Sequence, residues 1–374
     1  MKASIVPEPI ASQPWRVIVP LVVLVCFGAA VLYSAAAGSF GQFAESHLIR
    51  FAVFLVMALV MSYFSPELAR RVAFPVYGAV LLLLMAVEAI GAIGGGSQRW
   101  LNLGPLVLQP SELMKPAIVL VLARYFHQLP PGMTPTLRAM IPPAILIGLP
   151  VVLVLLQPDL GTALAITFGG LVVLFLAGTP VRWFTIGGVV AAVVAPLAYF
   201  FALHDYQRTR VTTFLDPESD PLGAGYHITQ SKIAIGSGGI FGKGFGNGSQ
   251  SHLDYLPEPH TDFVFATMAE EWGLVGGIFV LLVFGIVLRW GLAVARRAPD
   301  RFTRLLAGGM TATIFFYAGI NLMMVTGMAP VVGIPLPFMS HGGSSMMTNM
   351  ICIGTLMMVD RASRARRGSG GLSS

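Results

Sequence analysis

VIVPLVVLVCFGAAVLYSAA, residues 17–36, is the stretch of sequence that decides the fold class. It has no charged side chain, and an α-helix needs about 20 mostly apolar residues to cross the hydrocarbon core of a bilayer. Lys2 and Arg16 precede it, and the AAA at residues 35–37 resembles the cleavage site of a secretory signal. The apolar part of such a signal is usually only about 7–15 residues long. We therefore predict an uncleaved first membrane span.

The composition of the whole chain agrees with a membrane protein. Of the 374 residues, 55% are hydrophobic and 11% are charged, whereas a soluble domain is about 25% charged. Too few charges are present to cover a water-exposed surface. Cys26 and Cys352 both lie in apolar runs, which indicates neither a disulfide framework nor a metal cluster. The pI of 9.5 does not indicate nucleic-acid binding, because the arginines are distributed among the connections between apolar stretches.

Ten stretches are long and apolar enough to predict an all-α polytopic membrane protein. They are 16–36, 48–64, 71–93, 111–127, 139–157, 160–177, 184–203, 262–288, 304–326 and 344–360. With both termini in the cytoplasm, sixteen of the twenty-three Lys and Arg residues fall on the cytoplasmic side, in agreement with the positive-inside rule. The seven exceptions are Arg50, Arg99, Lys115, Arg208, Arg210, Lys232 and Lys243. These seven need a reason other than topology.

The longest connection, residues 204–261, is predicted to be a large extracytoplasmic loop with a short helix over residues 229–235. Its glycine-rich part, residues 236–248, contains Lys243. A P-loop is excluded, because no Ser or Thr follows this lysine and no strand precedes the glycines. Two interpretations stay open for the glycines, namely tight turns and a backbone nest that binds a phosphate.

Three further polar segments are predicted to face the same side of the membrane. In residues 97–115, Glu112 and Lys115 are spaced to share one helix face, either as an internal ion pair or as functional groups. In residues 157–162, Asp159 either caps the next helix or belongs to the site. Residues 333–345 predict a re-entrant loop that lines a cavity, with Ser344 or Ser345 capping the last span. Polar groups at one interface favour an enzyme over a carrier, whose site lies near the midplane.

The stretch LPEPHTDFVFATMAEEWG, residues 256–273, places four acids at the start of an apolar run. We expect Thr261 to be the N-cap of a helix, with Asp262 in its first turn at the mouth of the bundle. Asp262 is a candidate general base, although a helix-start aspartate is also common for structural reasons. Glu270 and Glu271 would lie about 12 Å deeper and are interpreted as internal packing partners.

With these residues in view, the chain resembles the SEDS family (shape, elongation, division and sporulation). The resemblance rests on RWLNLGPLVLQPSELMK (99–115), QPDLGT (157–162), GSGGIFGKGFGNGSQSHLDYLPEPHTDFVFATMAEEWGLVGG (236–277) and GIPLPFMSHGGSS (333–345), in that order. GKGFGNGSQ, LDYLPE and EEWG are more similar to the RodA branch than to the FtsW branch of division proteins. His341 departs from the family, which usually has Tyr there, and this leaves the role of that position open.

The resemblance implies a ten-span peptidoglycan glycosyltransferase of the bacterial cytoplasmic (inner) membrane that polymerises lipid II on the extracytoplasmic face. The donor is a growing glycan on undecaprenyl diphosphate. The GlcNAc 4-hydroxyl of lipid II attacks the MurNAc anomeric carbon with inversion, and lipid diphosphate leaves. Asp262 matches the essential aspartate of the family, its presumed general base. The resemblance also implies a class B penicillin-binding protein, the transpeptidase, as partner within the elongation complex.

The predicted substrate-binding residues surround this aspartate. A diphosphate leaving group needs cations, so the candidates are the cations Arg99, Lys115, Arg208, Arg210 and Lys243, together with Glu112, Asp159, Glu258, His260, Thr261 and Ser344. Arg208 and Arg210 are expected to contact the diphosphate, and Glu112 and Lys115 to order the cavity wall. No cofactor is expected to be obligatory, although a divalent cation such as Mg²⁺ is compatible with the chemistry.

The domain organisation is simple. Residues 1–374 are predicted to form one integral-membrane domain, with residues 361–374 as a basic, disordered cytoplasmic tail. Two rival functions stay open, a flippase for lipid II and a non-catalytic scaffold for a class B penicillin-binding protein. Within the family, the alternative is a division polymerase of the FtsW type.

Overall fold

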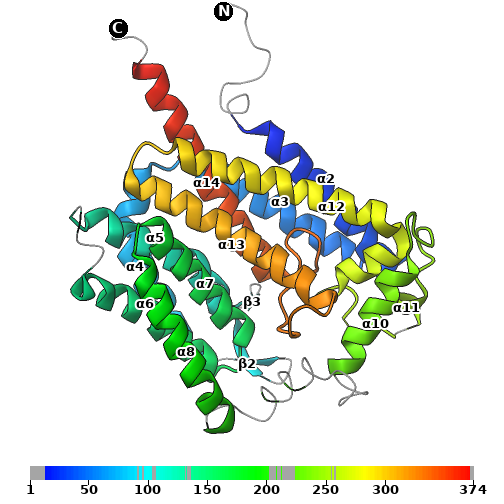
Figure 1. The fold of residues 1–374 in the computed structure, drawn as a ribbon. Helices are drawn as coiled ribbons and strands as arrows, with labels where there is room; N and C mark the ends of the chain where they lie inside the picture. Colours follow the sequence, from blue (N-terminus) through cyan, green and yellow to red (C-terminus); the bar gives the residue numbers. More distant parts are fainter. Residues whose placement is uncertain are drawn as a thin grey trace, which may run out of the picture.

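The computed structural model is almost entirely helical (Figure 1). It describes residues 13–90, 92–94, 97–102, 107–130, 132, 136–201, 208, 212, 224–253, 255–256 and 258–370. Each of the ten apolar stretches coincides with a helix, and the bounds differ mostly by a few residues. The ten helices are α2 (Trp15–Ala35), α3 (Ala44–Met61), α4 (Pro66–Ile90), α5 (Pro110–Gln128), α6 (Leu137–Leu156), α7 (Leu160–Leu176), α8 (Val181–Phe201), α12 (Val264–Arg297), α13 (Arg301–Val325) and α14 (Gly343–Gly370).

The lengths and compositions of these helices suit a membrane. Among the described residues, seven are long and apolar enough to cross one, namely α2, α3, α4, α6, α8, α12 and α13. The apolar helix α7 has 17 residues, and α5 is less apolar because it contains Glu112 and Lys115. The all-α membrane-type fold is therefore confirmed, whereas the number of crossings stays a prediction.

Smaller elements lie in the polar connections. Helix α10 (Ala224–Ser237) includes the short helix predicted over residues 229–235, and α11 (Ser249–His252) is a single turn. An unpredicted three-stranded antiparallel sheet precedes α5, in the order β1 (Ala92–Gly94), β2 (Ser97–Asn102), β3 (Val107–Leu108). In its register Ala92 pairs with Trp100, and Leu101 pairs with Leu108.

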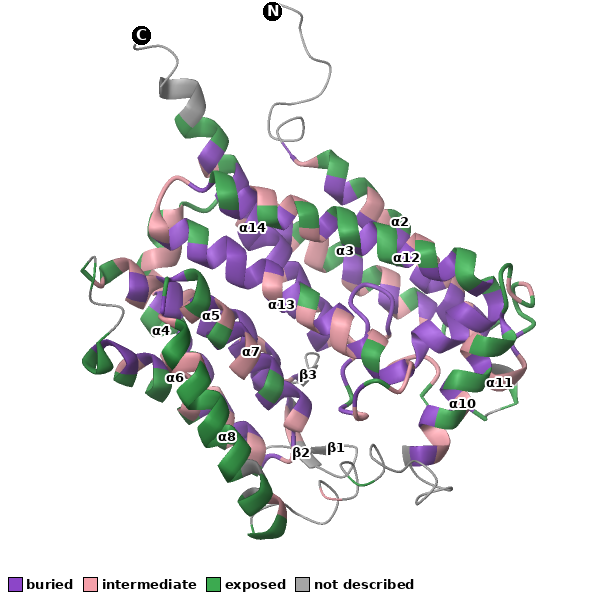
Figure 2. Ribbon diagram, viewed as in Figure 1, coloured by how far each residue is buried: buried purple, intermediate pink, exposed green. Residues whose placement is uncertain are grey.

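Helix α13 is the centre of the bundle. About two thirds of the residues in its most apolar stretch are buried, whereas none are in that of α8. Figure 2 shows α8 at the outside of the bundle with mostly exposed residues. Small residues allow the close approach of its neighbours. A Cβ on Gly309 would lie 2.4 Å from Val119 of α5, and a Cβ on Gly291 of α12 would lie 2.3 Å from Thr311. The helix begins with a capping box, in which Asp300 and Thr303 bond each other's backbone N–H groups.

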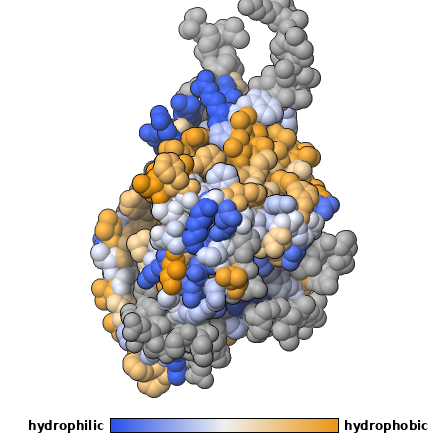
Figure 3. All heavy atoms as spheres, turned by 90° about the vertical axis from the view of Figure 1, so that its right-hand side faces the viewer, coloured by the Kyte–Doolittle hydropathy of each residue, from blue (hydrophilic) through white to orange (hydrophobic). Residues whose placement is uncertain are grey.

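The start of α2 and the end of α14, the first and last helices of the chain, lie on the same side of the bundle, at the top of Figure 1. Figure 3 shows a hydrophilic group next to these ends, a band of hydrophobic side chains below it, and a more hydrophilic area further away. The prediction of a disordered tail is wrong for residues 361–370, which continue α14. The continuation is stabilised because Arg364 pairs with Asp360 one turn earlier and Arg361 lies over the ring of Tyr63. Residues 371–374 lie outside the described part of the chain.

Candidate active site

Asp262 lies in the turn that leads into α12 and is partly buried. The predicted cap is wrong, because α12 begins at Val264 and its N-cap position is Phe263, without a side-chain cap. The side-chain amide of Asn321, near the end of α13, donates hydrogen bonds to the carbonyl oxygens of Asp262 and Ile334, each at 2.8 Å. Gly333 (φ 72°) lies beside the carboxylate, since a Cβ on it would be 3.5 Å from Oδ2. The backbone of Asp262 is therefore fixed to α13 while its carboxylate faces the loop between α13 and α14.

That loop also holds the residues before Asp262. Ser340 Oγ donates to the carbonyl oxygen of Thr261 at 2.6 Å, and the N–H of His341 donates to the carbonyl oxygen of His260 at 2.8 Å. Loop residues 334–340 are non-helical but mostly buried, which agrees with the prediction of an irregular segment enclosed by protein. Ser344 and Ser345 lie within the first turn of α14 and do not precede it, so the predicted cap is wrong here too.

A cluster of aromatic and basic side chains packs against this loop. The rings of Phe43 and His260 stack with centroids 4.1 Å apart, and Arg50 Nη1 lies 3.2 Å from His341 Nε2. Burial lowers the pKa of His341 below its ordinary value, and Arg50 and His260 lower it further. Burial also lowers the pKa of His260, although Glu258 opposes this. At neutral pH, His341 is therefore neutral and accepts a hydrogen bond from the guanidinium of Arg50.

A cavity of about 510 Å³ opens next to this cluster. Arg50, Trp100, Leu108, His341 and Ser344 are among its lining residues, and Arg50 carries the one formal charge among those described. The first turn of α14 forms part of the wall, so the positive end of its helix dipole lies at the cavity. An anionic group of a ligand is favoured here, because the guanidinium is not neutralised by a carboxylate in the lining.

Glu112 and Lys115 form the predicted ion pair, with Nζ 2.6 Å from Oε1. Both side chains are buried, and Lys115 Nζ also donates to the hydroxyl of Tyr317 at 2.7 Å. The same hydroxyl donates to the other oxygen of Glu112. Thr348 in α14 donates to the carbonyl oxygen of Glu112 at 3.2 Å. The triad of Glu112, Lys115 and Tyr317 therefore joins α5 to α13, and Thr348 joins α14 to α5, next to Met347 in the lining of the cavity.

Asp159 and Arg99 stabilise helix ends. The carboxylate of Asp159 accepts from the N–H of Thr162 at 3.0 Å and so caps α7, as one of the two interpretations predicts. The guanidinium of Arg99 donates to the carbonyl oxygens of Gln157 (3.0 Å) and Pro158 at the end of α6. The first turn of α7 packs closely against the loop between α13 and α14, because a Cβ on Gly161 would be 2.7 Å from the carbonyl oxygen of Val332.

The glycine-rich segment packs against a break in α12 at Gly273, whose φ and ψ of 61° and −156° are not helical. The N–H groups of Lys243 and Gly244 donate to the carbonyl oxygens of Glu270 and Glu271, each at 3.0 Å. In return, the carbonyl oxygens of Gly239 and Ile240 accept from the N–H groups of Leu274 and Val275, at 2.9 and 3.1 Å. The segment thus bonds backbone groups around the break, so these amides do not form a phosphate nest.

Side chains reinforce the same contact. Lys243 Nζ lies 2.6 Å from Oε1 of Glu270, whose side chain is fully buried and also accepts from Ser249 and the N–H of Gln250. Glu271 accepts from Ser34 of α2. Both glutamates are therefore internal packing partners, as expected. Lys243 is a structural partner of Glu270 in this arrangement.

The remaining predicted residues lie at the rim or beyond the described part. Glu258 is exposed at φ 47°, and its carboxylate accepts from Thr261 Oγ1 at 2.9 Å and lies 3.5 Å from His260 Nε2. Arg208 donates to the carbonyl oxygen of Phe200 at 2.9 Å. Arg210 lies outside the described residues. No group of three or more His, Cys, Asp and Glu side chains that could hold a metal ion occurs among the described residues.

Sequence reasoning missed Arg50, Trp100, Tyr317 and Asn321 as site residues. Arg50 was detectable, because it is one of the seven cations that the topology does not explain. Tyr317 and Asn321 stand four residues apart on one face of α13, but nothing local distinguishes them from other polar residues in an apolar helix. Their partners lie 205 and 59 residues away along the chain, so their function emerges only from the packing.

The fold and this site define a helical membrane-type protein with a carboxylate and a cation gathered at one end of the bundle. The chain belongs to the FtsW/RodA/SpoVE family of cell cycle proteins, whose family model matches residues 14–365. It is 45% identical over 341 residues to the peptidoglycan glycosyltransferase MrdB of Escherichia coli K12, covering 91% of each chain. It is 37% identical over 287 residues to the stage V sporulation protein E of Bacillus subtilis 168, covering 76% of this chain and 77% of that protein.

Solved structures show the same architecture. A chain of a peptidoglycan synthase complex, described as coordinating polymerization and crosslinking, matches with a TM-score of 0.82 at 33% identity, covering 94% of this chain and 98% of the other. The rod shape determining protein RodA of Thermus thermophilus matches with a TM-score of 0.70 at 30% identity, covering 93% and 97%. The family prediction is therefore confirmed, and the enzyme class named for MrdB is the one that the motifs predict.

Proposed function

We propose that this chain is a peptidoglycan glycosyltransferase that polymerises lipid II at the extracytoplasmic face of the inner membrane. One observation carries the proposal: the loop that lines the cavity beside Arg50 is also hydrogen-bonded to the segment that carries Asp262. The segment of the candidate base and the guanidinium of Arg50 thereby both contact one loop, residues 334–341. Inverting glycosyl transfer to a hydroxyl from a lipid diphosphate needs both groups.

In this mechanism, Asp262 removes the proton from the GlcNAc 4-hydroxyl of lipid II as that oxygen attacks the MurNAc anomeric carbon. The bond to the lipid diphosphate breaks on the opposite face, which gives inversion. Arg50, oriented by neutral His341, binds the departing diphosphate together with the start of α14. The buried triad of Glu112, Lys115 and Tyr317 keeps the cavity wall in place.

The other parts of the proposal follow the family pattern. Arg208 and Arg210 are proposed to contact the diphosphate from the long loop, and Glu258, His260, Thr261 and Ser344 to form the rim of the site. Both termini lie in the cytoplasm, and a class B penicillin-binding protein of the elongation complex is the partner. No cofactor is proposed to be obligatory, and a divalent cation such as Mg²⁺ is compatible with the diphosphate chemistry.

The test is a polymerisation assay with labelled lipid II and the purified full-length chain bound to its penicillin-binding protein. The wild-type complex should give glycan ladders, and Asp262→Asn should lower their rate of formation about 10²- to 10⁴-fold. Glu67→Gln is the matched control, because this carboxylate is exposed and pairs with Arg70 near the start of α4, close to the chain ends. A rate for Asp262→Asn close to that of Glu67→Gln would refute the assignment of the base.

The same preparation separates the rival functions. A lipid II flippase gives no ladder but moves labelled lipid II across a vesicle membrane, and a scaffold does neither. An elongation polymerase should be activated by the elongation transpeptidase and not by the division one. Activation by the division transpeptidase alone would indicate the FtsW type.

A further inference from the structure

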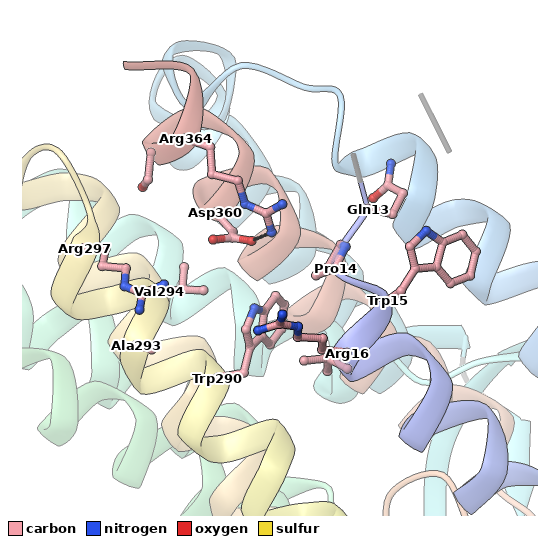
Figure 4. Close-up of a pocket in the computed structure, with 12 residues that line it drawn as sticks. Gln13, Pro14, Trp15, Arg16, Trp290, Ala293, Val294, Arg297, Asp360 and Arg364 are labelled. Atoms are coloured by element: carbon pink, nitrogen blue, oxygen red, sulfur yellow. Dashed lines mark hydrogen bonds and ion pairs between the residues drawn. The ribbon is translucent and has the colours of Figure 1, made fainter. Parts of the chain in front are cut away.

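A second cavity lies at the end of the bundle next to the chain ends, far from Asp262. It has a volume of about 520 Å³ and is enclosed by the start of α2, the last turns of α12 and the end of α14 (Figure 4). From Val264 to Val294, α12 rises by about 45 Å. The second cavity is thus at the opposite end of α12 from Asp262, and nothing in the proposed glycosyl transfer uses it.

The second cavity has an excess of positive charge. Arg16, Arg297 and Arg364 line it, against the single acid Asp360 among its described lining residues. Asp360 is buried and pairs with Arg364. Within the part of the chain that the structure describes, neither Arg16 nor Arg297 donates a hydrogen bond to the protein or forms an ion pair. Two guanidinium groups from different helices therefore face one space, and the one described acid there, Asp360, is paired with Arg364.

The walls of the cavity are amphipathic. Trp290, partly exposed, stands between the arginines in Figure 4, and Val17, Ala293 and Val294 form an apolar surface beside it. Tryptophan with arginine above an apolar surface is the arrangement found where membrane proteins meet lipid headgroups. Guanidinium groups bind phosphate oxygens through paired hydrogen bonds.

We propose that this cavity binds the phosphodiester headgroup of an anionic phospholipid from the cytoplasmic leaflet. Arg16 and Arg297 hold the phosphate oxygens, and the indole of Trp290 packs against the glycerol backbone. Basic pockets between helices on the cytoplasmic side are known to suit such headgroups. Because its ligands come from α2 and α12 and its wall from α14, the bound lipid fastens the two ends of the chain to the bundle.

The experiment uses the full-length chain in detergent with phosphatidylglycerol or phosphatidylcholine added, followed by native mass spectrometry and by thermal unfolding. The wild type should retain phosphatidylglycerol and unfold at a higher temperature with it, but not with phosphatidylcholine. Arg16→Gln/Arg297→Gln should lower the affinity for phosphatidylglycerol about 25-fold, since each arginine near an anionic surface contributes about a factor of five. If the double variant does not fold, Arg297→Gln alone should lower it about fivefold.

The matched control is Arg71→Gln/Arg138→Gln, which removes the same charge from exposed arginines outside the cavity. Phosphatidylglycerol binding by this control should equal that of the wild type. Equal losses in both double variants would show diffuse surface attraction and overturn the site. Equal stabilisation by inorganic phosphate or glycerol 3-phosphate would show a site for a soluble anion and overturn the lipid assignment.

Discussion

Replacing Lys115 by methionine tests the buried triad of Glu112, Lys115 and Tyr317. Methionine keeps most of the length of the side chain but removes the charge that lies 2.6 Å from Glu112 and the donor that lies 2.7 Å from Tyr317. Since Lys115 is 1% exposed, water cannot take its place beside the carboxylate. Removing one partner of a buried ion pair costs about 3–5 kcal/mol, because the other charge is left without compensation. We expect a loss of that size in the free energy of unfolding.

The double variant Glu112→Leu/Lys115→Met separates the charge from the packing. Both charges are then absent, and the remaining cost is the unpaired hydroxyl of Tyr317, about 1–2 kcal/mol. The double variant should therefore be more stable than Lys115→Met alone. The measurement is unfolding in mild detergent, with all variants compared at one scan rate. Losses that simply add, with the double variant less stable than either single variant, would refute the account of the triad.

Two further predictions concern the glycine-rich segment and the histidine cluster. A Cβ on Gly242 would lie 2.0 Å from the carbonyl oxygen of Glu271, whereas one on Gly246, at a similar positive φ, meets nothing within 4 Å. Gly242→Ala should thus lower the unfolding temperature far more than Gly246→Ala, whose cost is about 1–2 kcal/mol of backbone strain; equal shifts would contradict the close contact. Because the folded-state pKa of His341 is lowered, the folded state binds fewer protons than the unfolded one. The contribution of His341 to the free energy of unfolding is then fully present above about pH 6.5 and is lost as the pH falls below it. His341→Asn should make the unfolding temperature depend less on pH in this range. An unchanged pH profile would contradict the prediction.

The long helices could be predicted from the sequence because each depends on a local property, about 20 consecutive apolar residues. The predicted start of α12, with Thr261 as its N-cap, is wrong for a physical reason. Thr261 has the side chain of an N-cap, but its hydroxyl donates locally to Glu258, and distant Ser340 binds its carbonyl oxygen. The helix therefore begins only at Val264. Similarly, the charges of the tail suggested disorder, although an ion pair one turn apart continues α14.

The candidate site was only partly predictable. Asp262 depended on the family resemblance, because its local sequence is equally typical of a structural aspartate. The sequence singled out the seven cations that the topology does not explain, but it did not indicate which residues they contact. Arg99 binds carbonyl oxygens at a helix end and Lys243 binds Glu270, whereas Arg50 faces the cavity. Whether a cation binds another part of the protein or faces the cavity depends on neighbours from distant parts of the chain.

The break at Gly273 has a consequence for how the protein is made. Backbone groups around this break are bonded by residues 239–244, which precede α12 in the chain. During synthesis residues 239–244 emerge before α12. They can therefore form hydrogen bonds with the backbone groups around the break as soon as α12 enters the membrane, where unpaired backbone groups are costly. An insertion or deletion within residues 239–244 would shift every bond at once. During evolution, insertions and deletions in the connection between α8 and α12 should therefore occur outside residues 239–244.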